Sequence, residues 1–136
     1  NRYFMKRSRM LFLFLPLLAF ASCSEGNNPE KVAEKFNKAL YTADFEGAKA
    51  LCTDESKQAV DFVTAFASQK VDEMKKANVK FEVTNVTLAE DGNSAVVEAV
   101  VLGSIDLEKG GVKDSVDTKT NLVKIQDKWL VEFKLK

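Results

Sequence analysis

Apolar residues recur at helical spacing over residues 29–77. Asn28, an N-cap residue followed by a proline and an acid, begins an amphipathic pattern over residues 29–42. A second, shorter helix is predicted for residues 44–52, with Asp44 as its cap, and a third for residues 54–77. The pattern therefore predicts three N-terminal helices.

From residue 79 the apolar positions alternate with a period of two, which is typical of strands. The apolar phase shifts near Thr84–Asn85, which predicts a β-bulge because a slip of one residue exchanges the two faces of a strand. Residues 90–93, with their Asp-Gly pair, predict a tight hairpin turn. Residues 95–102 are apolar on both faces except at Glu98, which indicates a central strand.

Two more strands complete the pattern. A polar loop around residues 109–111 leads to a long third strand that ends at Ile125, and a short turn precedes a last strand that begins at Trp129. Helices followed by strands indicate an α+β fold, with three helices packed on a four-stranded antiparallel meander in a single domain over residues 29–136. Six aromatic residues are predicted to line its core or a pocket: Phe36, Phe62, Phe66, Phe81, Trp129 and Phe133.

The chain begins with a pattern that is typical of a secretion signal. Three basic residues within 6–9 precede the apolar run 11–20, and small residues lie directly before Cys23. The apolar run is shorter than the roughly 20 residues of a membrane-spanning helix. The ending on a cysteine resembles a bacterial lipobox, which implies a signal peptide over residues 1–22, a lipid on Cys23, and a tether over residues 23–28.

Charge argues against nucleic acid as a partner. The chain has 20 basic and 20 acidic residues, and four of the bases lie in the predicted signal peptide, so the mature domain would carry 16 bases and a net charge near −4. Its lysines alternate with acids and form no basic stripe, whereas phosphate binding needs clustered cations. We therefore expect no nucleic-acid partner.

Two ends of the domain resemble a known superfamily. Residues 29–36 and 43–49 at its start, and residues 121–125 and 128–131 at its end, resemble small bacterial envelope lipoproteins of the nuclear transport factor 2-like superfamily, close to the lumazine-binding-like group and to a related domain of unknown function. The resemblance implies a curved sheet around a long helix, shaped as a cone whose open end can hold a ligand. Some members are isomerases or dehydratases, and many are binding or dimerising modules.

Candidate catalytic groups are scarce in this chain. It has no histidine, and Tyr41, at the end of the first predicted helix, is expected to pack with its hydroxyl in water. Three acids, Glu98, Asp114 and Asp117, are the remaining candidates for a base, and we expect them to be exposed or paired with lysine. Neither a metal site nor a cofactor is expected, because only carboxylates remain as ligands.

Cys52 follows apolar residues in a helical pattern and is expected to be a buried thiol. It would have no disulfide partner if Cys23 carries a lipid.

The leading hypothesis is a non-enzymatic lipoprotein of the bacterial cell envelope, on the periplasmic face or the cell surface. It would bind a small apolar ligand or a protein partner. The alternatives are a cone-type isomerase or dehydratase with Asp114 or Asp117 as base, and a homodimerisation module.

Overall fold

The structure is a computed structural model that describes residues 28–134. The predicted signal peptide and Cys23 lie outside the described residues. Within these residues, four helices precede four strands. Their bounds are α2 (Pro29–Tyr41), α3 (Phe45–Ala50), α4 (Lys57–Phe66), α5 (Val71–Lys76), β1 (Lys80–Leu88), β2 (Ser94–Leu102), β3 (Val116–Ile125) and β4 (Lys128–Glu132).

Both predicted helix caps are confirmed. The side chain of Asn28 accepts hydrogen bonds from the backbone N–H groups of Glu30 and Lys31, at 2.9 and 3.3 Å. Asp44 accepts one from the N–H of Gly47 at 3.1 Å. These contacts satisfy N–H groups that lack partners in the first turn of a helix. The two cap residues therefore determine where α2 and α3 begin.

The third predicted helix is corrected, because the structure divides it into α4 and α5. The two helices are separated by a turn over residues 67–70, in which the N–H of Lys70 bonds the carbonyl of Ala67 at 2.8 Å. Ala67 is fully buried at this turn, while Ser68 and Gln69 are exposed. The change of direction also places Met74 of α5 in the core, where it is 3% exposed.

The four strands form one antiparallel sheet in the order β1-β2-β3-β4. The predicted bulge is confirmed, since the β1–β2 register shifts between Val83 and Asn85. The predicted hairpin turn is confirmed as well, with Gly92 at a φ of +74°. β2 is an internal strand, as its apolar sequence indicates.

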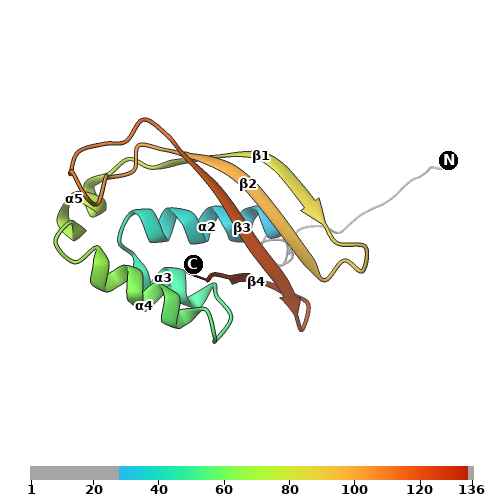
Figure 1. The fold of residues 1–136 in the computed structure, drawn as a ribbon. Coiled ribbons are helices and arrows are strands. Elements are labelled where there is room, and N and C mark those ends of the chain that lie inside the picture. Colours follow the sequence, from blue (N-terminus) through green and yellow to red (C-terminus); the bar gives the residue numbers. More distant parts are fainter. Residues whose placement is uncertain (1–27, 135–136) are drawn as a thin grey trace, which may run out of the picture.

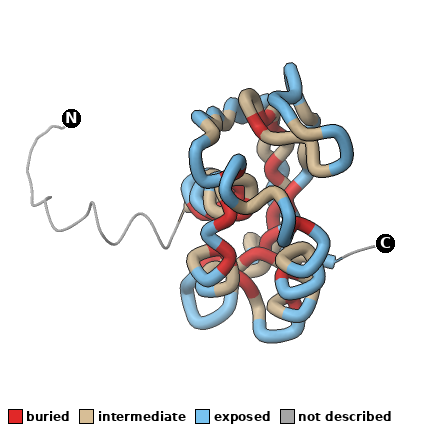
Figure 2. Tube along the Cα trace, turned by 90° about the vertical axis from the view of Figure 1, so that its left-hand side faces the viewer, coloured by how far each residue is buried: buried red, intermediate tan, exposed pale blue. Residues whose placement is uncertain are grey.

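Helix α2 lies against one face of this sheet and contacts all four strands. In Figure 1 it lies behind β2 and β3. Alternate residues of β2 point to that face and are buried. They are Ala95, Val97, Ala99 and Val101. Buried positions therefore run along the inside of the sheet and along the facing side of α2 (Figure 2).

The aromatic residues divide into a buried and an exposed group. Phe36 and Trp129 are 2% and 4% exposed, and the rings of Phe36 and Phe133 lie 5.3 Å apart. Phe81 is half-buried and packs against the core. Phe62 and Phe66 of α4 are 63% and 62% exposed, so of the two predicted places, core or pocket, neither residue lies in the core.

The reason lies in the orientation of α4. This helix is apolar on more than one side, and it directs Val60, which is fully buried, toward the core. Phe62 and Phe66, four residues apart on one face of the helix, then lie on another side of α4.

In the described part of the chain, no helix has the length and apolar character needed to cross a bilayer.

A candidate ligand-binding hollow

The candidate site forms where β4 separates from β3. The last paired residues of these strands are Asn121 and Glu132, so within the described residues the first half of β3, residues 116–120, has no strand on its β4 side. In an antiparallel sheet the backbone groups of alternate residues point to opposite neighbours. The N–H and C=O groups of Asp117 and Lys119 therefore point to the open side of β3 rather than to β2.

Hydrogen bonds to another part of the chain hold the end of β4 away from β3. The N–H of Phe133 donates to the buried hydroxyl of Ser56 at 2.9 Å. Two residues earlier, Val131 donates to the carbonyl of Leu51 and accepts from the N–H of Thr53, at 2.8 and 3.0 Å. The connection between α3 and α4 thus positions residues 131–133 and leaves a gap beside β3.

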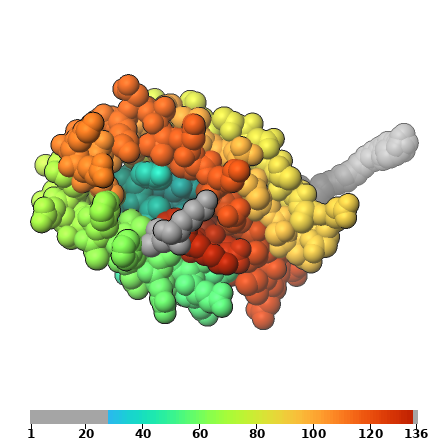
Figure 3. Space-filling view, in the orientation of Figure 1, coloured from blue at the N-terminus to red at the C-terminus, as the bar shows by residue number. Residues whose placement is uncertain are grey.

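The gap is a hollow of about 240 Å³, which we call the first hollow. Its walls come from α2, β3 and the chain around β4, and Figure 3 shows part of α2 exposed between these strands and the helices of residues 57–76. It is lined by Phe36, Asn37, Leu40, Tyr41, residues 117–121 and residues 131–134.

A second hollow of about 480 Å³ adjoins the first and shares with it Leu40, Tyr41 and Phe133. Its walls come from α4, α5 and the loop between β2 and β3. Most of them are apolar, and Phe66 lies among them although it is largely exposed. The remaining lining residues are Val63, Met74, Ser104, Ile105, Asp106, Leu107, Glu108, Lys113 and Val116.

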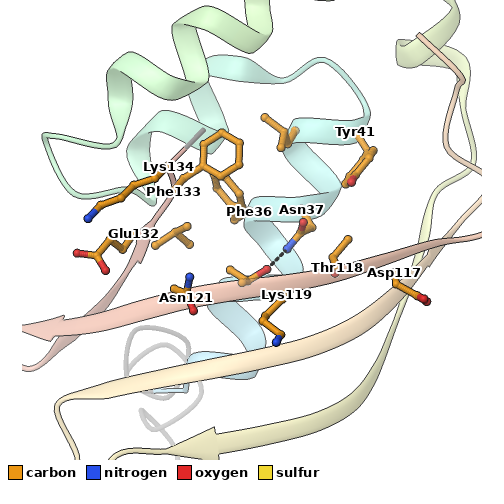
Figure 4. A pocket seen from close by; sticks show the side chains of 13 residues that line it. Phe36, Asn37, Tyr41, Asp117, Thr118, Lys119, Asn121, Glu132, Phe133 and Lys134 are labelled. Atoms are coloured by element: carbon orange, nitrogen blue, oxygen red, sulfur yellow. Dashed lines mark hydrogen bonds between the residues drawn. The ribbon is translucent and has the colours of Figure 1, made fainter. Parts of the chain in front are cut away.

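Two buried polar side chains lie at the floor of the first hollow. The amide nitrogen of Asn37 donates to the carbonyl of Ala33 at 2.8 Å and to the hydroxyl of Thr120 at 2.9 Å. Asn37 is 4% exposed and Thr120 is 5% exposed. Figure 4 shows this contact between α2 and β3, with Tyr41 one helical turn farther along.

Ser104 is the polar residue that stands out in the second hollow. It is 1% exposed, and its hydroxyl has no hydrogen-bond partner among the described residues. An unmade hydrogen bond of a buried polar group costs about 1–3 kcal/mol. A ligand group that bonds this hydroxyl would recover part of that free energy.

Tyr41 and Asp106 are the ionisable groups at the hollows whose pKa is shifted. Burial raises the pKa of the Tyr41 phenol above its usual value, so this hydroxyl stays protonated at neutral pH. The N–H groups of Lys109 and Glu108 lower the pKa of Asp106, which remains an anion. Neither group has the pKa near neutrality that general acid–base catalysis favours.

The predicted site residues are only partly brought together. Phe36 and Phe133 line the first hollow, and Phe66 and Phe133 line the second. Trp129 is a core residue, and the Lys124 ammonium lies 5.4 Å from its ring centroid. Phe62 lines neither hollow.

The candidate acids lie apart from one another. Asp114 is exposed, and Asp117 is an exposed residue on the rim of the first hollow. Glu98 is half-buried on the opposite face of the sheet, where it accepts a hydrogen bond from Asn85 at 3.3 Å and pairs in register with Lys119. Within residues 28–134, no group of three or more metal-ligating side chains comes together.

Sequence reasoning missed Asn37, Thr120 and Ser104. Asn37 gave a usable signal, because it is a polar residue beside Phe36 on the apolar stripe of a predicted helix. Thr120 and Ser104 gave none, because hydroxyl residues are common in strands and loops.

Comparisons with known proteins identify the fold. Neither a family model nor a curated protein matches the chain. Among solved structures, it resembles a candidate NTF2-like transpeptidase from Campylobacter jejuni, with a TM-score of 0.56 and 23% identity over 79% of this chain and 99% of that one. It also resembles a protein of unknown function with a cystatin-like fold from Nostoc punctiforme, with a TM-score of 0.51 and 15% identity over 75% and 81% of the two chains. The fold is therefore of the nuclear transport factor 2-like type, as the sequence resemblance implies.

Proposed function

We propose that this chain is a non-enzymatic binding module that holds a small apolar ligand in the second hollow. The observation that carries the proposal is the hollow itself, whose 480 Å³ lies within the range of about 300–1,000 Å³ that is usual for ligand sites. Its walls are mainly apolar, with few polar groups, which is the composition that such sites share.

Phe66 supports the same proposal. A phenylalanine that is 62% exposed loses the free energy that burial would give, about 1.5–3 kcal/mol for a large apolar side chain. Because Phe66 lines the second hollow, an apolar ligand there would cover part of its ring. The ligand would thus remove apolar surface of the protein from water as well as its own.

The location of the module follows from the N-terminal sequence. We propose that residues 1–22 are a signal peptide and that a lipid on Cys23 tethers the domain to a membrane of the bacterial envelope. A tether of six residues spans at most about 20 Å, so the hollow would lie close to the membrane surface. Apolar ligands partition into membranes, which makes this a suitable place for such a module.

The test uses two phenylalanines that differ only in their relation to the hollow. Phe62 and Phe66 lie on the same helix and are equally exposed, but only Phe66 lines the second hollow. We expect Phe66→Ala to weaken binding of the neutral fluorescent probe N-phenyl-1-naphthylamine about tenfold, a loss near 1.4 kcal/mol. The matched Phe62→Ala should bind the probe as the wild type does.

Fluorescence titration of the probe gives both affinities, and thermal unfolding verifies that both variants are folded. Saturable binding that is weakened at Phe66 alone supports the proposal. No saturable binding, or equal losses in the two variants, would contradict it.

A further inference from the structure

The buried pair at the floor of the first hollow has hydrogen-bonding capacity left over. The carbonyl of Ala33 is only an acceptor, so the group of Asn37 that faces it must be the amide nitrogen. The Asn37 carbonyl oxygen, Oδ1, then points elsewhere, and no donor within residues 28–134 bonds it. It is not among the buried side-chain atoms that lack a partner, so it is open to the hollow that Asn37 lines.

The same argument applies to Thr120. Its hydroxyl oxygen accepts the hydrogen bond from Asn37, and its proton therefore needs a different partner. No acceptor for that proton lies among the described residues. Asn37 and Thr120, which both line the first hollow, thus leave one acceptor and one donor without a partner among the described residues.

The charges around the first hollow balance. Two acids, Asp117 and Glu132, and two lysines, Lys119 and Lys134, line it. A balanced rim gives neither an anionic nor a cationic head group an advantage. Two acids, Asp106 and Glu108, and one lysine, Lys113, line the second hollow, so its charges give an anionic head group no advantage either.

We propose that Asn37 and Thr120 form a subsite for a neutral carboxamide head group, carried by an amphipathic ligand whose apolar part occupies the second hollow. The amide N–H donates to Asn37 Oδ1, and the amide carbonyl accepts from the Thr120 hydroxyl. The two hollows share Leu40, Tyr41 and Phe133, so one flexible molecule can lie across both. This inference rests on the proposed function and names the chemical class of the ligand.

The experiment compares three ligands with the same ten-carbon chain. Decanamide has a donor and an acceptor, methyl decanoate has an acceptor only, and decanoate is an anion. Each competes with N-phenyl-1-naphthylamine for the wild-type protein. We expect decanamide to compete about fivefold better than methyl decanoate, since one neutral hydrogen bond contributes about 1 kcal/mol.

Variants of β3 assign the effect to the pair. Thr120→Val keeps the shape of the side chain and removes the hydroxyl, and should weaken decanamide about fivefold. Thr120→Ser restores the hydroxyl and should restore the affinity. The control is Thr84→Val, because Thr84 also lies on a strand and its hydroxyl donates to the carbonyl of Glu98 at 3.1 Å, but it lines neither hollow. Decanamide should bind this variant as it binds the wild type.

The outcomes separate the two proposals. Methyl decanoate or decanoate competing as well as decanamide would overturn the carboxamide subsite and leave the apolar hollow intact. An unchanged affinity of Thr120→Val for decanamide would do the same, with thermal unfolding to verify that each variant is folded. Failure of the probe and of all three ligands to bind would overturn the proposed function together with this inference.

Discussion

At the scale of the residue, Cys52 shows how burial changes chemistry. The side chain is 4% exposed, and its thiol donates to the carbonyl of Ala48 at 3.3 Å. Burial raises the pKa of the Cys52 thiol from 9.0 to about 11, although the positive charge of Lys57 acts in the opposite direction. The sequence prediction of a buried thiol is confirmed.

This pKa makes the stability of the domain depend on alkaline pH. In the unfolded chain the thiol ionises near pH 9, whereas in the folded domain it stays protonated until about pH 11. The unfolded state therefore loses its proton first, and the free energy of unfolding falls between these two pH values, by on the order of 2 kcal/mol. Urea unfolding at about pH 8 and about pH 10.5 measures the loss.

The control is Cys52→Ala, which keeps Tyr41 and every other titrating group. Its free energy of unfolding should fall less over the same pH interval. Equal decreases in the two proteins would mean that the Cys52 thiol does not ionise differently in the folded and unfolded states.

Single residues also show what the sequence can and cannot predict. Trp129 and Phe36 lie on strictly alternating or helical stripes, and their burial follows from the pattern. Phe62 and Phe66 belong to a segment with apolar residues on several sides, so periodicity does not determine which side faces the core. The packing of α4 against its neighbours determines which side of the helix faces the core, and the local sequence does not indicate it.

At the scale of the element, glycines mark where strands and loops need special backbone geometry. Gly103 follows β2 with a φ of +82°, and a Cβ on it would lie 2.5 Å from the carbonyl oxygen of Asn78. Gly92, in the β1–β2 turn, has a φ of +74° but no atom within 4 Å of such a Cβ. The two positions share the strained backbone and differ in the close contact.

Alanine at each position separates these two contributions. Gly92→Ala should lower the free energy of unfolding by about 1 kcal/mol, the strain of a left-handed residue. Gly103→Ala should lower it by about 3 kcal/mol or more, because the backbone of Asn78 must also move. Urea denaturation of both variants measures the difference. Equal decreases would show that the chain next to Asn78 shifts at no cost.

Elements with strong local signals were predicted well. The caps at Asn28 and Asp44, the bulge near Asn85 and the turn at Gly92 each have a local chemical cause, and the structure confirms them. The division between α4 and α5 has no such cause in the sequence, which lacks glycine and proline over residues 67–70. Met74 of α5 is 3% exposed in the core, and burial is a property of the assembled domain rather than of the local sequence.

At the scale of the whole molecule, the hollows arise from contacts between distant segments. Ser56 and the segment 51–53 hold the end of β4, and the gap beside β3 follows from that arrangement. Asn37 and Thr120 are 83 residues apart in the sequence. The fold class could be predicted because it depends on the order of helices and strands along the chain. The site could not be predicted, because it depends on the point at which β4 separates from β3 in the folded domain.

The last prediction concerns the attachment of the whole domain to a membrane. In the described residues, no helix is long and apolar enough to cross a bilayer, and the anchor we propose is a lipid on Cys23. A single acyl chain binds membranes only marginally, at about 0.8 kcal/mol per buried CH₂, while the multiple acylation of a lipoprotein cysteine gives stable anchoring. We therefore expect Cys23→Ser to move the protein from the membrane fraction to the soluble envelope fraction.

The measurement is fractionation of the expressing cells, followed by a wash in high salt that removes proteins held by charge alone. The matched control is Cys52→Ser, which removes the other cysteine of the chain and should remain in the membrane fraction. Mass spectrometry of the wild type should find acyl chains on Cys23. Retention of Cys23→Ser in the salt-washed membranes would contradict the lipid anchor and would require another mode of attachment.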